Sequence, residues 1–171
     1  MRIIAGSAKG RTLQAPGNTK GVRPTADRVR ETLFNVLGQW MDGLSVLDLF
    51  AGTGALGLEA LSRGAKRAVL VDVDTSLAQR NARELGFEVT LLKMPAQRAI
   101  EQLVKRGEKF DLVFSDPPYA DEVGREILEA VRPLLDEGAR VVIEHSKREA
   151  MPEEGRVDER RFGDTVVSIY T

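Results

Sequence analysis

The sequence predicts one α/β domain built on a mostly parallel, doubly wound sheet of the Rossmann type. Its 171 residues are enough for a single domain with a sizeable core. From Gly43 onward, short apolar segments alternate with segments of helical length, which is typical of a parallel sheet covered by helices on both faces. The end of the chain replaces this alternation with a hairpin pattern, which indicates antiparallel strands at one edge of the sheet.

The first 24 residues are expected to form a short extension ahead of the main domain at residues 25–171. Arg2–Ala5 and Gly10–Gln14 are short β-type segments, and we expect them to pair as a hairpin. A helix is then predicted from Thr25, a suitable N-cap residue. Its apolar face consists of residues at helical spacing: Val29, Leu33, Leu37 and Trp40. We expect Trp40 to close this helix onto the core.

Five strands, four helices and a terminal hairpin are predicted after Gly43. The strands are Ser45–Leu49, Arg67–Val71, Glu88–Leu92, Phe110–Ser115 and Arg140–Glu144. The helices between them are Ala55–Ser62, Thr75–Leu85, Ala96–Lys105 and Asp121–Val131. The hairpin strands are Arg156–Phe162 and Thr165–Tyr170. Together these strands make a seven-stranded sheet with an antiparallel end.

The composition removes several classes of chemistry. The chain has no cysteine and a single histidine, His145, which excludes disulfides, thiolate sites and zinc clusters, so that no metal site is expected. We expect His145 to be structural. No apolar run is long enough to span a membrane, and the first residues do not form a signal peptide, which favours a cytoplasmic protein.

Basic residues gather at the start of a chain whose formal net charge is only −1. No acidic residue precedes Asp27. The cations before it are Arg2, Lys9, Arg11, Lys20 and Arg23. A locally basic segment on a near-neutral body is typical of proteins that bind a phosphate backbone. The alternative is a solvated, flexible terminus.

The segment LDLFAGTGALG at residues 47–57 has the glycine pattern of a cofactor-binding turn and follows the first predicted strand. Gly52, Gly54 and Gly57 permit a tight turn and a close backbone approach at the start of a helix. Asp72 ends the next strand, where an acceptor for ribose hydroxyl groups is expected. These features suit NAD and S-adenosylmethionine almost equally, and any tight turn between a strand and a helix also favours glycine.

Asp48 separates these two cofactors. It lies within the apolar strand before the glycine turn, so its carboxylate is expected beside that turn. A carboxylate is unfavourable next to a pyrophosphate and favourable next to the ammonium and sulfonium groups of S-adenosylmethionine. An aspartate that merely accepts backbone N–H groups is the alternative.

The segment SDPPY at residues 115–119 follows the fourth predicted strand and therefore opens into the same crevice. Pro117 and Pro118 hold a rigid turn without N–H donors, so that carbonyl groups and the Asp116 carboxylate offer acceptors. Tyr119 is available to stack on a ring. Such a site suits the exocyclic amine of a nucleobase, because acceptors that bind its N–H groups free its lone pair to attack a methyl group. Asp116 then either takes the released proton or only stabilises the growing charge.

These motifs, together with RPTADRVRETLFNVL at residues 23–37 and VDVD at residues 71–74, resemble the bacterial methyltransferases that modify the exocyclic N2 of one guanine in 16S ribosomal RNA. The resemblance extends from MRIIAGSAKGRTL to the final hairpin. It implies the seven-stranded class I fold of S-adenosylmethionine-dependent methyltransferases. It also implies a monomer that acts on 16S rRNA in the 30S subunit or in an assembly intermediate.

Charge and resemblance together assign residues to roles. The cofactor would contact Asp48, Ala51, Gly52, Thr53, Gly54, Gly57, Asp72, Val73 and Ala96. The guanine amine would be held by Asp116, Pro117, Pro118 and Tyr119. RNA would meet Arg2, Lys9, Arg11, Arg23, Thr25, Arg28 and Arg30, the last four near the mouth of the site. One position departs from the family pattern: Pro95-Ala96 stands where an Asp-Ala pair commonly contacts the adenine, so that contact must come from elsewhere.

Three other functions remain open at this point. An adenine-N6 methyltransferase of DNA would use the same chemistry, but 171 residues leave no separate target-recognition domain. An NAD-dependent oxidoreductase would use the glycine pattern, but the chain lacks an obvious hydride-transfer partner. A non-catalytic RNA-binding module would use only the basic residues.

Overall fold

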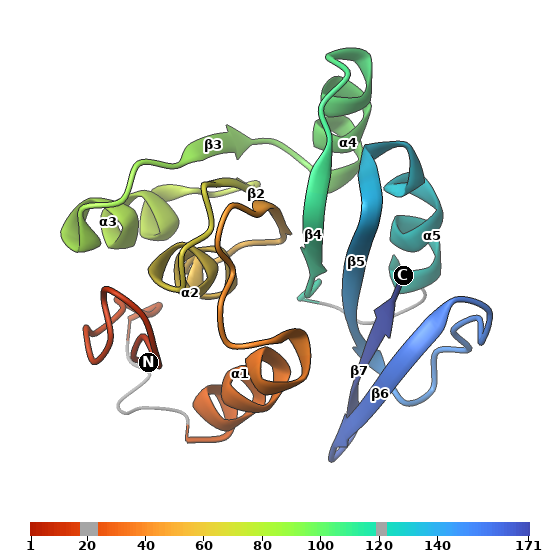
Figure 1. Cartoon of the computed structure of the whole chain (residues 1–171), viewed down its shortest axis with the longest axis horizontal. Helices are drawn as coiled ribbons and strands as arrows, with labels where there is room; N and C mark the ends of the chain where they lie inside the picture. The colour runs from red at the N-terminus through yellow and green to blue at the C-terminus, as the bar shows by residue number, and fades with distance from the viewer. Residues whose placement is uncertain (18–23, 119–122) are drawn as a thin grey trace.

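The structure of the protein, a computed structural model, describes residues 1–17, 24–118 and 123–171 (Figure 1). The helices are α1 Pro24–Leu37, α2 Ala55–Ser62, α3 Ser76–Leu85, α4 Ala96–Lys105 and α5 Val123–Ala130, with a 3-10 turn at Arg132–Leu134. The strands are β1 Ser45–Leu49, β2 Arg67–Asp72, β3 Thr90–Lys93, β4 Phe110–Ser115, β5 Leu135–Ser146, β6 Arg156–Phe162 and β7 Thr165–Tyr170. No helix in the described ranges is long and apolar enough to cross a membrane.

The seven strands form one sheet in the order β3-β2-β1-β4-β5-β7-β6. Strands β1 to β5 are parallel, whereas β7 runs antiparallel to β5 and β6 antiparallel to β7. This confirms the predicted fold class, including its antiparallel edge. The strand order reverses between β1 and β4, which is where open α/β sheets bind their ligands.

Three strands differ from the prediction in their bounds, and the smallest difference is that β2 ends at Asp72 rather than at Val71. β5 begins at Leu135 and ends at Ser146, rather than covering Arg140–Glu144, because β4 pairs with it on one side and β7 on the other. β3 covers Thr90–Lys93 rather than Glu88–Leu92, because it is an edge strand that pairs only with the last part of β2.

Helices cover both faces of the sheet. On one face, α4 and α5 pack on odd-numbered side chains of β1, β4 and β5, such as Leu47 and Val113. On the other face, α1 and α2 pack on even-numbered side chains, such as Val46, Phe114 and Val142. Because side chains alternate along a strand, this pattern fixes which residues at the strand ends share a face.

The N-terminal extension, residues 1–17, packs onto the domain. Ile3, Ala8 and Leu13 are buried in one apolar cluster with side chains of α2 and α3. Gly6 has a φ of 88°, and a Cβ atom there would lie 1.8 Å from the carbonyl oxygen of Ser62, so only glycine fits. The basic residues of the extension therefore sit on a docked segment.

The hairpin predicted within this extension is wrong in extent. A single antiparallel bridge joins Arg2 and Thr12, and no strand is assigned on either side. The backbone N–H groups of Ile4 and Ala5 donate instead to the two carboxylate oxygens of Glu59, at 2.9 and 3.1 Å. The two segments do pair, since the N–H of Ile3 donates to the carbonyl of Arg11 and the N–H of Leu13 to that of Met1, but the contact with α2 limits this pairing to one short bridge.

The prediction that Arg30 meets RNA near the site is also wrong. Arg30 is buried, and its guanidinium donates to Glu59, to Asp27 and to the carbonyl oxygen of Arg2. A guanidinium enclosed by two carboxylates presents no free charge to a phosphate. Arg30 instead joins α1 to α2 and to the extension.

The predicted role of Trp40 is wrong as well. α1 ends at Leu37, and Gly38 follows with a φ of 105°, so the helical spacing does not reach Trp40. The Trp40 residue is 67% exposed, and Met41 is fully buried in the core beside α1.

Candidate active site at the strand ends

The register of the central strands brings acidic side chains from separate segments together. β1 pairs with β4 so that Asp48 stands two positions before the level of Asp116. On the other side of β4, Ser115 pairs with Ile143, which puts Glu144 beside Asp116. Asp48, Asp116 and Glu144 therefore share the face that α1 and α2 cover. With Asp72 at the end of β2 they form a group that we call the strand-end cluster.

The glycine turn is fastened to the strand-end cluster. Gly52 and Gly54 have φ angles of 56° and 81°, a backbone conformation that favours glycine. The N–H of Gly52 donates to the Asp72 carboxylate at 2.7 Å, and the N–H of Ala51 donates to the carbonyl of Val71 at 2.8 Å. The turn thus stays at the carboxyl end of β1, where the sequence predicts it.

Asp48 is buried beneath the start of α2. Its Oδ2 accepts the N–H of Gly57 at 2.9 Å, and a Cβ on Gly57 would lie 2.4 Å from the side chain of Leu70. The pKa of Asp48 is raised to about 7, mainly by burial, with a smaller contribution from the charges of Asp116 and Asp72 and with the Gly57 hydrogen bond acting in the opposite direction. Asp48 thus has the backbone partner expected in the structural alternative, and it also lies in a field that favours a nearby cation.

Asp116 and Glu144 form a hydrogen-bonded carboxyl pair at the ends of β4 and β5. Partial loss of hydration raises the pKa of Asp116, and the hydrogen bond from Glu144 lowers it. Loss of hydration, the charge of Asp116 and the same hydrogen bond raise the pKa of Glu144 to about 8. Glu144 is not among the site residues predicted from the sequence. An acidic residue inside the apolar run VVIEH is the signal that could have found it.

The negative charge of this cluster is not balanced within the described ranges. None of the ion pairs there involves Asp48, Asp72, Asp116 or Glu144. No group of three or more His, Cys, Asp or Glu side chains in those ranges is arranged to hold a metal ion. The raised pKa values of Asp48, Asp116 and Glu144 mean that a cation bound nearby would stabilise their charged forms.

Two apolar residues border the turn on the side of β2 and β3. Val73 follows Asp72 directly and is 64% exposed, so its side chain is available to lie against a planar ring. Ala96 is buried and begins α4 after Pro95, whose φ and ψ of −59° and 148° are extended. The first N–H groups of α4 lack partners within the helix and can serve as donors near this border.

Asn81 links the glycine turn to the extension. Its Nδ2 donates to the carbonyl oxygens of Thr53 and Gln14, at 2.9 and 3.0 Å, and its Oδ1 accepts the N–H of Gln14 at 2.7 Å. Asn81 is almost completely buried in α3. No local pattern in the sequence indicates this role, because it depends on how the extension docks.

The motif after β4 is described in part. Pro117 is buried and Pro118 is exposed, and neither offers an N–H donor. Tyr119 and Arg23 lie outside the described residues, as does the side chain of Thr25. The expected stacking by Tyr119 stays a prediction.

Comparison with known proteins identifies the family. A family profile with the description "Conserved hypothetical protein 95" matches residues 1–171. The chain belongs to this family. The ribosomal RNA small subunit methyltransferase D of Escherichia coli is 41% identical over 138 residues, which are 80% of this chain and 67% of that protein.

Solved structures support the same assignment. The structure of the Escherichia coli protein yhhF, provisionally described as a methyltransferase, has a TM-score of 0.84 and 34% identity, covering 99% of this chain and 96% of that one. The Thermus thermophilus 16S rRNA N2 G1207 methyltransferase, solved with AdoMet and guanosine, has a TM-score of 0.70 and covers 90% of this chain and 44% of that one. At 19% identity it shares the fold alone.

The exposed cations that were predicted to meet RNA lie on two segments. Arg140 donates to the carbonyl of Leu37 at the end of α1, so the start of α1, with exposed Arg28, lies toward the carboxyl ends of the strands. Arg2, Lys9 and Arg11 are exposed on the docked extension, where Arg11 donates to the carbonyl of Glu84 near the end of α3.

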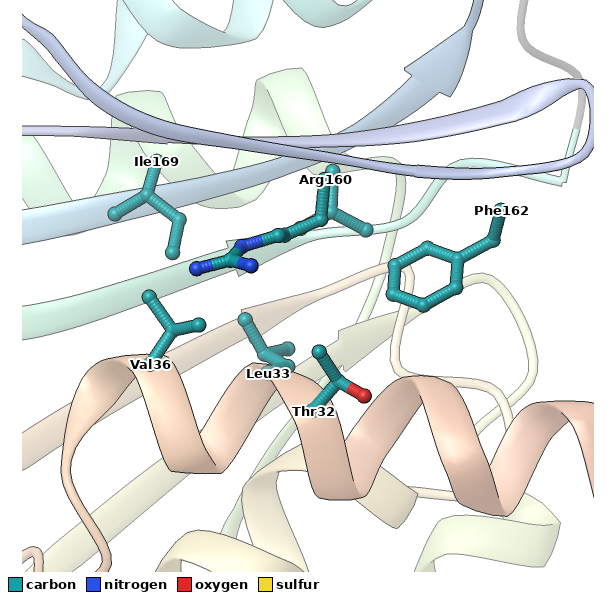
Figure 2. A pocket seen from close by; sticks show the side chains of 7 residues that line it. Thr32, Leu33, Val36, Arg160, Phe162 and Ile169 are labelled. Carbon is teal, nitrogen blue, oxygen red and sulfur yellow. The ribbon is translucent and has the colours of Figure 1, made fainter.

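Two hollows in the described residues lie elsewhere. Figure 2 shows the first, in which Arg160 and Phe162 reach from β6 toward Leu33 and Val36 of α1. It encloses only about 10 Å³ and is a packing gap. The second, of about 280 Å³, lies beside the C-terminal hairpin, where Lys147 is paired with Asp164 and the arginines with Glu159.

His145 borders this second hollow. Its ring is buried, with Nε2 2.8 Å from Ser168 Oγ and Nδ1 2.9 Å from the carbonyl of Ser146. Both ring nitrogens are thus satisfied by the protein, which agrees with the structural role expected for this histidine.

Proposed function

We propose that the protein is an S-adenosylmethionine-dependent methyltransferase that modifies the exocyclic N2 of a guanine in small-subunit ribosomal RNA. The observation that carries this proposal is the strand-end cluster, in which Asp48, Asp72 and Asp116 lie around a glycine turn without a cationic partner in the described ranges. The family relationship to the Escherichia coli small-subunit enzyme supports the substrate class.

The residues of the cluster fit the cofactor. Asp48 and its acidic neighbours would hold the ammonium group and face the sulfonium. Gly52 and Gly54 leave room for close approach of the methionine part. Asp72 Oδ2 accepts the N–H of Gly52, and Oδ1, which accepts the N–H of Asp74 at 3.3 Å, would also accept from the ribose hydroxyls. Val73 would lie against the adenine. The other cofactor contacts we propose are Ala51, Thr53, Gly57 and Ala96. When bound, S-adenosylmethionine supplies an electrophilic methyl group.

Asp116 and the two prolines after it would receive the guanine amine. The Asp116 carboxylate accepts an N–H of that amine, and the carbonyl groups of the turn accept the other, because Pro117 and Pro118 supply no competing donor. Both acceptors draw the N–H bonds out of the plane of the base and leave the nitrogen lone pair free to attack. Tyr119 would stack on the base.

RNA would contact the exposed cations of the extension and of α1, which are Arg2, Lys9, Arg11 and Arg28, with Arg23 and Thr25 near the site. These cations lie on two segments that pack together, because Arg30 of α1 donates to the carbonyl of Arg2. The RNA would be 16S rRNA within the 30S subunit or an assembly intermediate, bound by a monomer in the cytoplasm.

Two alternatives are less well supported. An NAD-dependent oxidoreductase would place a pyrophosphate beside carboxylates, which Coulomb repulsion disfavours. A DNA adenine methyltransferase agrees with the Asp-Pro-Pro motif, but it lacks the support that the relatives give to ribosomal RNA.

The experiment uses the protein with methyl-labelled S-adenosylmethionine and three substrates: 30S subunits, naked 16S rRNA and duplex DNA. RNA is digested to nucleosides and the labelled one is identified by mass spectrometry. We expect N2-methylguanosine from 30S subunits and little label in DNA. Label on adenosine alone, or none in RNA, would contradict the proposal.

A further inference from the structure

Glu144 has no role in the proposed contacts, although it lies beside the proposed catalytic group. The β4–β5 register pairs Ser115 with Ile143, so the next residue of each strand brings Asp116 and Glu144 together on one face. The two neighbouring carboxyl groups interact, and this interaction lowers the pKa of Asp116 and raises the pKa of Glu144. A hydrogen bond between two carboxyl groups needs a proton on one of them, and these directions place it on Glu144.

Among the described residues, no unpaired cation lies directly beside Glu144, and Arg160 of β6, on the same face one strand beyond Val167, donates to Asp158. β4 presents Asp116 and β1 presents Asp48, while β7 opposes Glu144 with Val167. The start of α1 carries Asp27 and Arg30, which pair with each other, and the exposed side chains of Arg28 and Glu31. Two adjacent carboxyl groups without a cation are most stable when they share one proton.

We propose that Glu144 is a positioning residue for methyl transfer, which shares a single proton with Asp116 and so holds the Asp116 carboxylate toward the amine of the acceptor base. This inference rests on the proposed function, because it assigns Asp116 to that amine. Glu144 acts only through Asp116 and does not touch the substrate.

Because the pair holds only one proton, it can accept the proton that methylation releases. In the methyl transfer, the nitrogen lone pair would form the N–C bond while the bond between the methyl group and sulfur breaks, and its electrons would stay on sulfur as the neutral thioether leaves. The nitrogen then bears a positive charge. One N–H proton passes to the Asp116 carboxylate, and its bonding electrons return to nitrogen as the lone pair. The carboxyl pair thereby changes from one proton to two and from one negative charge to none. It returns the extra proton to water when the product leaves.

The test compares Glu144→Gln with Glu144→Ala, because glutamine keeps a donor toward Asp116 and alanine does not. The matched control is Glu137→Gln, at an exposed position near the other end of the same strand. We expect Glu144→Ala to lower kcat about 100-fold with KM for RNA changed less than about three-fold. Glu144→Gln should keep at least ten times more of kcat than Glu144→Ala.

The pH profile separates positioning from a merely structural role. Wild-type kcat should fall above about pH 8, where the pair loses its shared proton, because the pKa of Glu144 is raised to about 8. In Glu144→Gln this fall should disappear, since glutamine donates at every pH. Equal kcat losses in the two variants, or a Glu144→Gln profile that superimposes on that of the wild type, would overturn the inference.

A measurement on the protein without cofactor keeps this inference distinct from the proposed function. A carboxyl group whose pKa is raised by folding stabilises the fold less and less as pH rises from its ordinary value to the raised one. Glu144→Gln should therefore unfold at a higher temperature than the wild type at pH 9, with a smaller difference at pH 5, whereas Glu137→Gln should show neither effect. If no methyl reaches guanine, the proposed function fails, and this comparison still decides whether the proton is shared. An unfolding difference independent of pH would refute it.

Discussion

Two buried carboxylates, Glu59 of α2 and Asp48 of β1, differ in the charges that surround them. Glu59 is completely buried, and its oxygens accept from Arg30, Arg63 and the backbone N–H groups of Ile4 and Ala5. Asp48 is equally buried, but its one recorded donor is the N–H of Gly57, and its other close charges are negative.

This difference indicates what each group is for. At Glu59 the protein supplies both cations itself, so the charge is compensated when the chain folds and holds the extension in place. At the strand-end cluster the described residues leave the negative charge uncompensated. This charge makes folding less favourable and makes the binding of a cationic ligand more favourable. Substitution of Glu59 should therefore change stability, whereas substitutions in the strand-end cluster should change activity and cofactor affinity.

The largest effect is expected at Asp116, where Asp116→Ala should lower kcat about 1,000-fold while the unfolding temperature stays the same or rises. The catalytic acceptor is lost, but so is a carboxyl group with a raised pKa. Single-turnover transfer of labelled methyl groups measures the rate, and thermal unfolding measures the fold. A non-catalytic RNA-binding protein would show no change in any activity, which is the outcome that contradicts the comparison.

Glu59→Ala should have the opposite signature. It leaves Arg30 and Arg63 buried without their shared carboxylate, which costs about 3–5 kcal/mol and lowers the unfolding temperature by on the order of 10 °C. Glu101→Ala, at an exposed position on α4, is the control. Unfolding temperatures that agree within about 2 °C for the two variants would show that the Glu59 contacts do not hold the extension.

An intermediate effect is expected at Asp48. Asp48→Asn removes the buried charge but keeps an acceptor for Gly57, so affinity for S-adenosylhomocysteine should fall about ten-fold, or about 1.4 kcal/mol. Because the pKa of Asp48 is about 7, the wild-type affinity should rise roughly ten-fold between pH 6 and pH 8, as the carboxylate ionises. Calorimetric titration at both pH values measures this, and the variant should show a smaller rise.

The unfolding temperature of Asp48→Asn distinguishes a role of Asp48 in cofactor binding from a role in the fold. A raised carboxyl pKa removes stability progressively as pH increases from about 4 to about 7, so Asp48→Asn should be at least as stable as the wild type at pH 8. A variant that binds weakly and also unfolds at lower temperature would mean that Asp48 serves the fold, as Glu59 does.

The sequence was sufficient for the features that depend on local pattern. β1, α2, α4 and β4 begin and end at the predicted residues, because apolar runs and glycine turns specify them. Asp48, Asp72 and Asp116 were placed at the carboxyl ends of their strands, since the topology of a parallel sheet requires it.

Features that depend on pairing between distant segments were not accessible. Glu144 meets Asp116 only because β5 lies next to β4, and Arg30 is buried only because Glu59 of α2 lies beneath it. A charge count of the first residues includes Arg30 as a free cation, but the fold places it in an ion pair. Local charge therefore predicts a basic surface more reliably for Arg11 and Arg28 than for a residue on the inner face of a helix.

The smallest effect is expected for RNA affinity when the exposed cations of the extension are replaced. Replacing Arg2, Lys9 and Arg11 together with glutamine should weaken RNA binding about three- to ten-fold and reduce the slope of log affinity against log salt by about two, because fewer counterions are released. Affinity for S-adenosylhomocysteine should not change, since these side chains lie on the docked extension and Arg11 reaches the end of α3.

The control for this prediction removes two exposed cations at the end of α4, Lys105 and Arg106. Filter binding across a salt series measures both variants. Parallel salt slopes for the wild type and the triple variant would mean that the extension is docked for stability alone, and that the cations nearer the strand-end cluster, such as Arg28, bind the RNA.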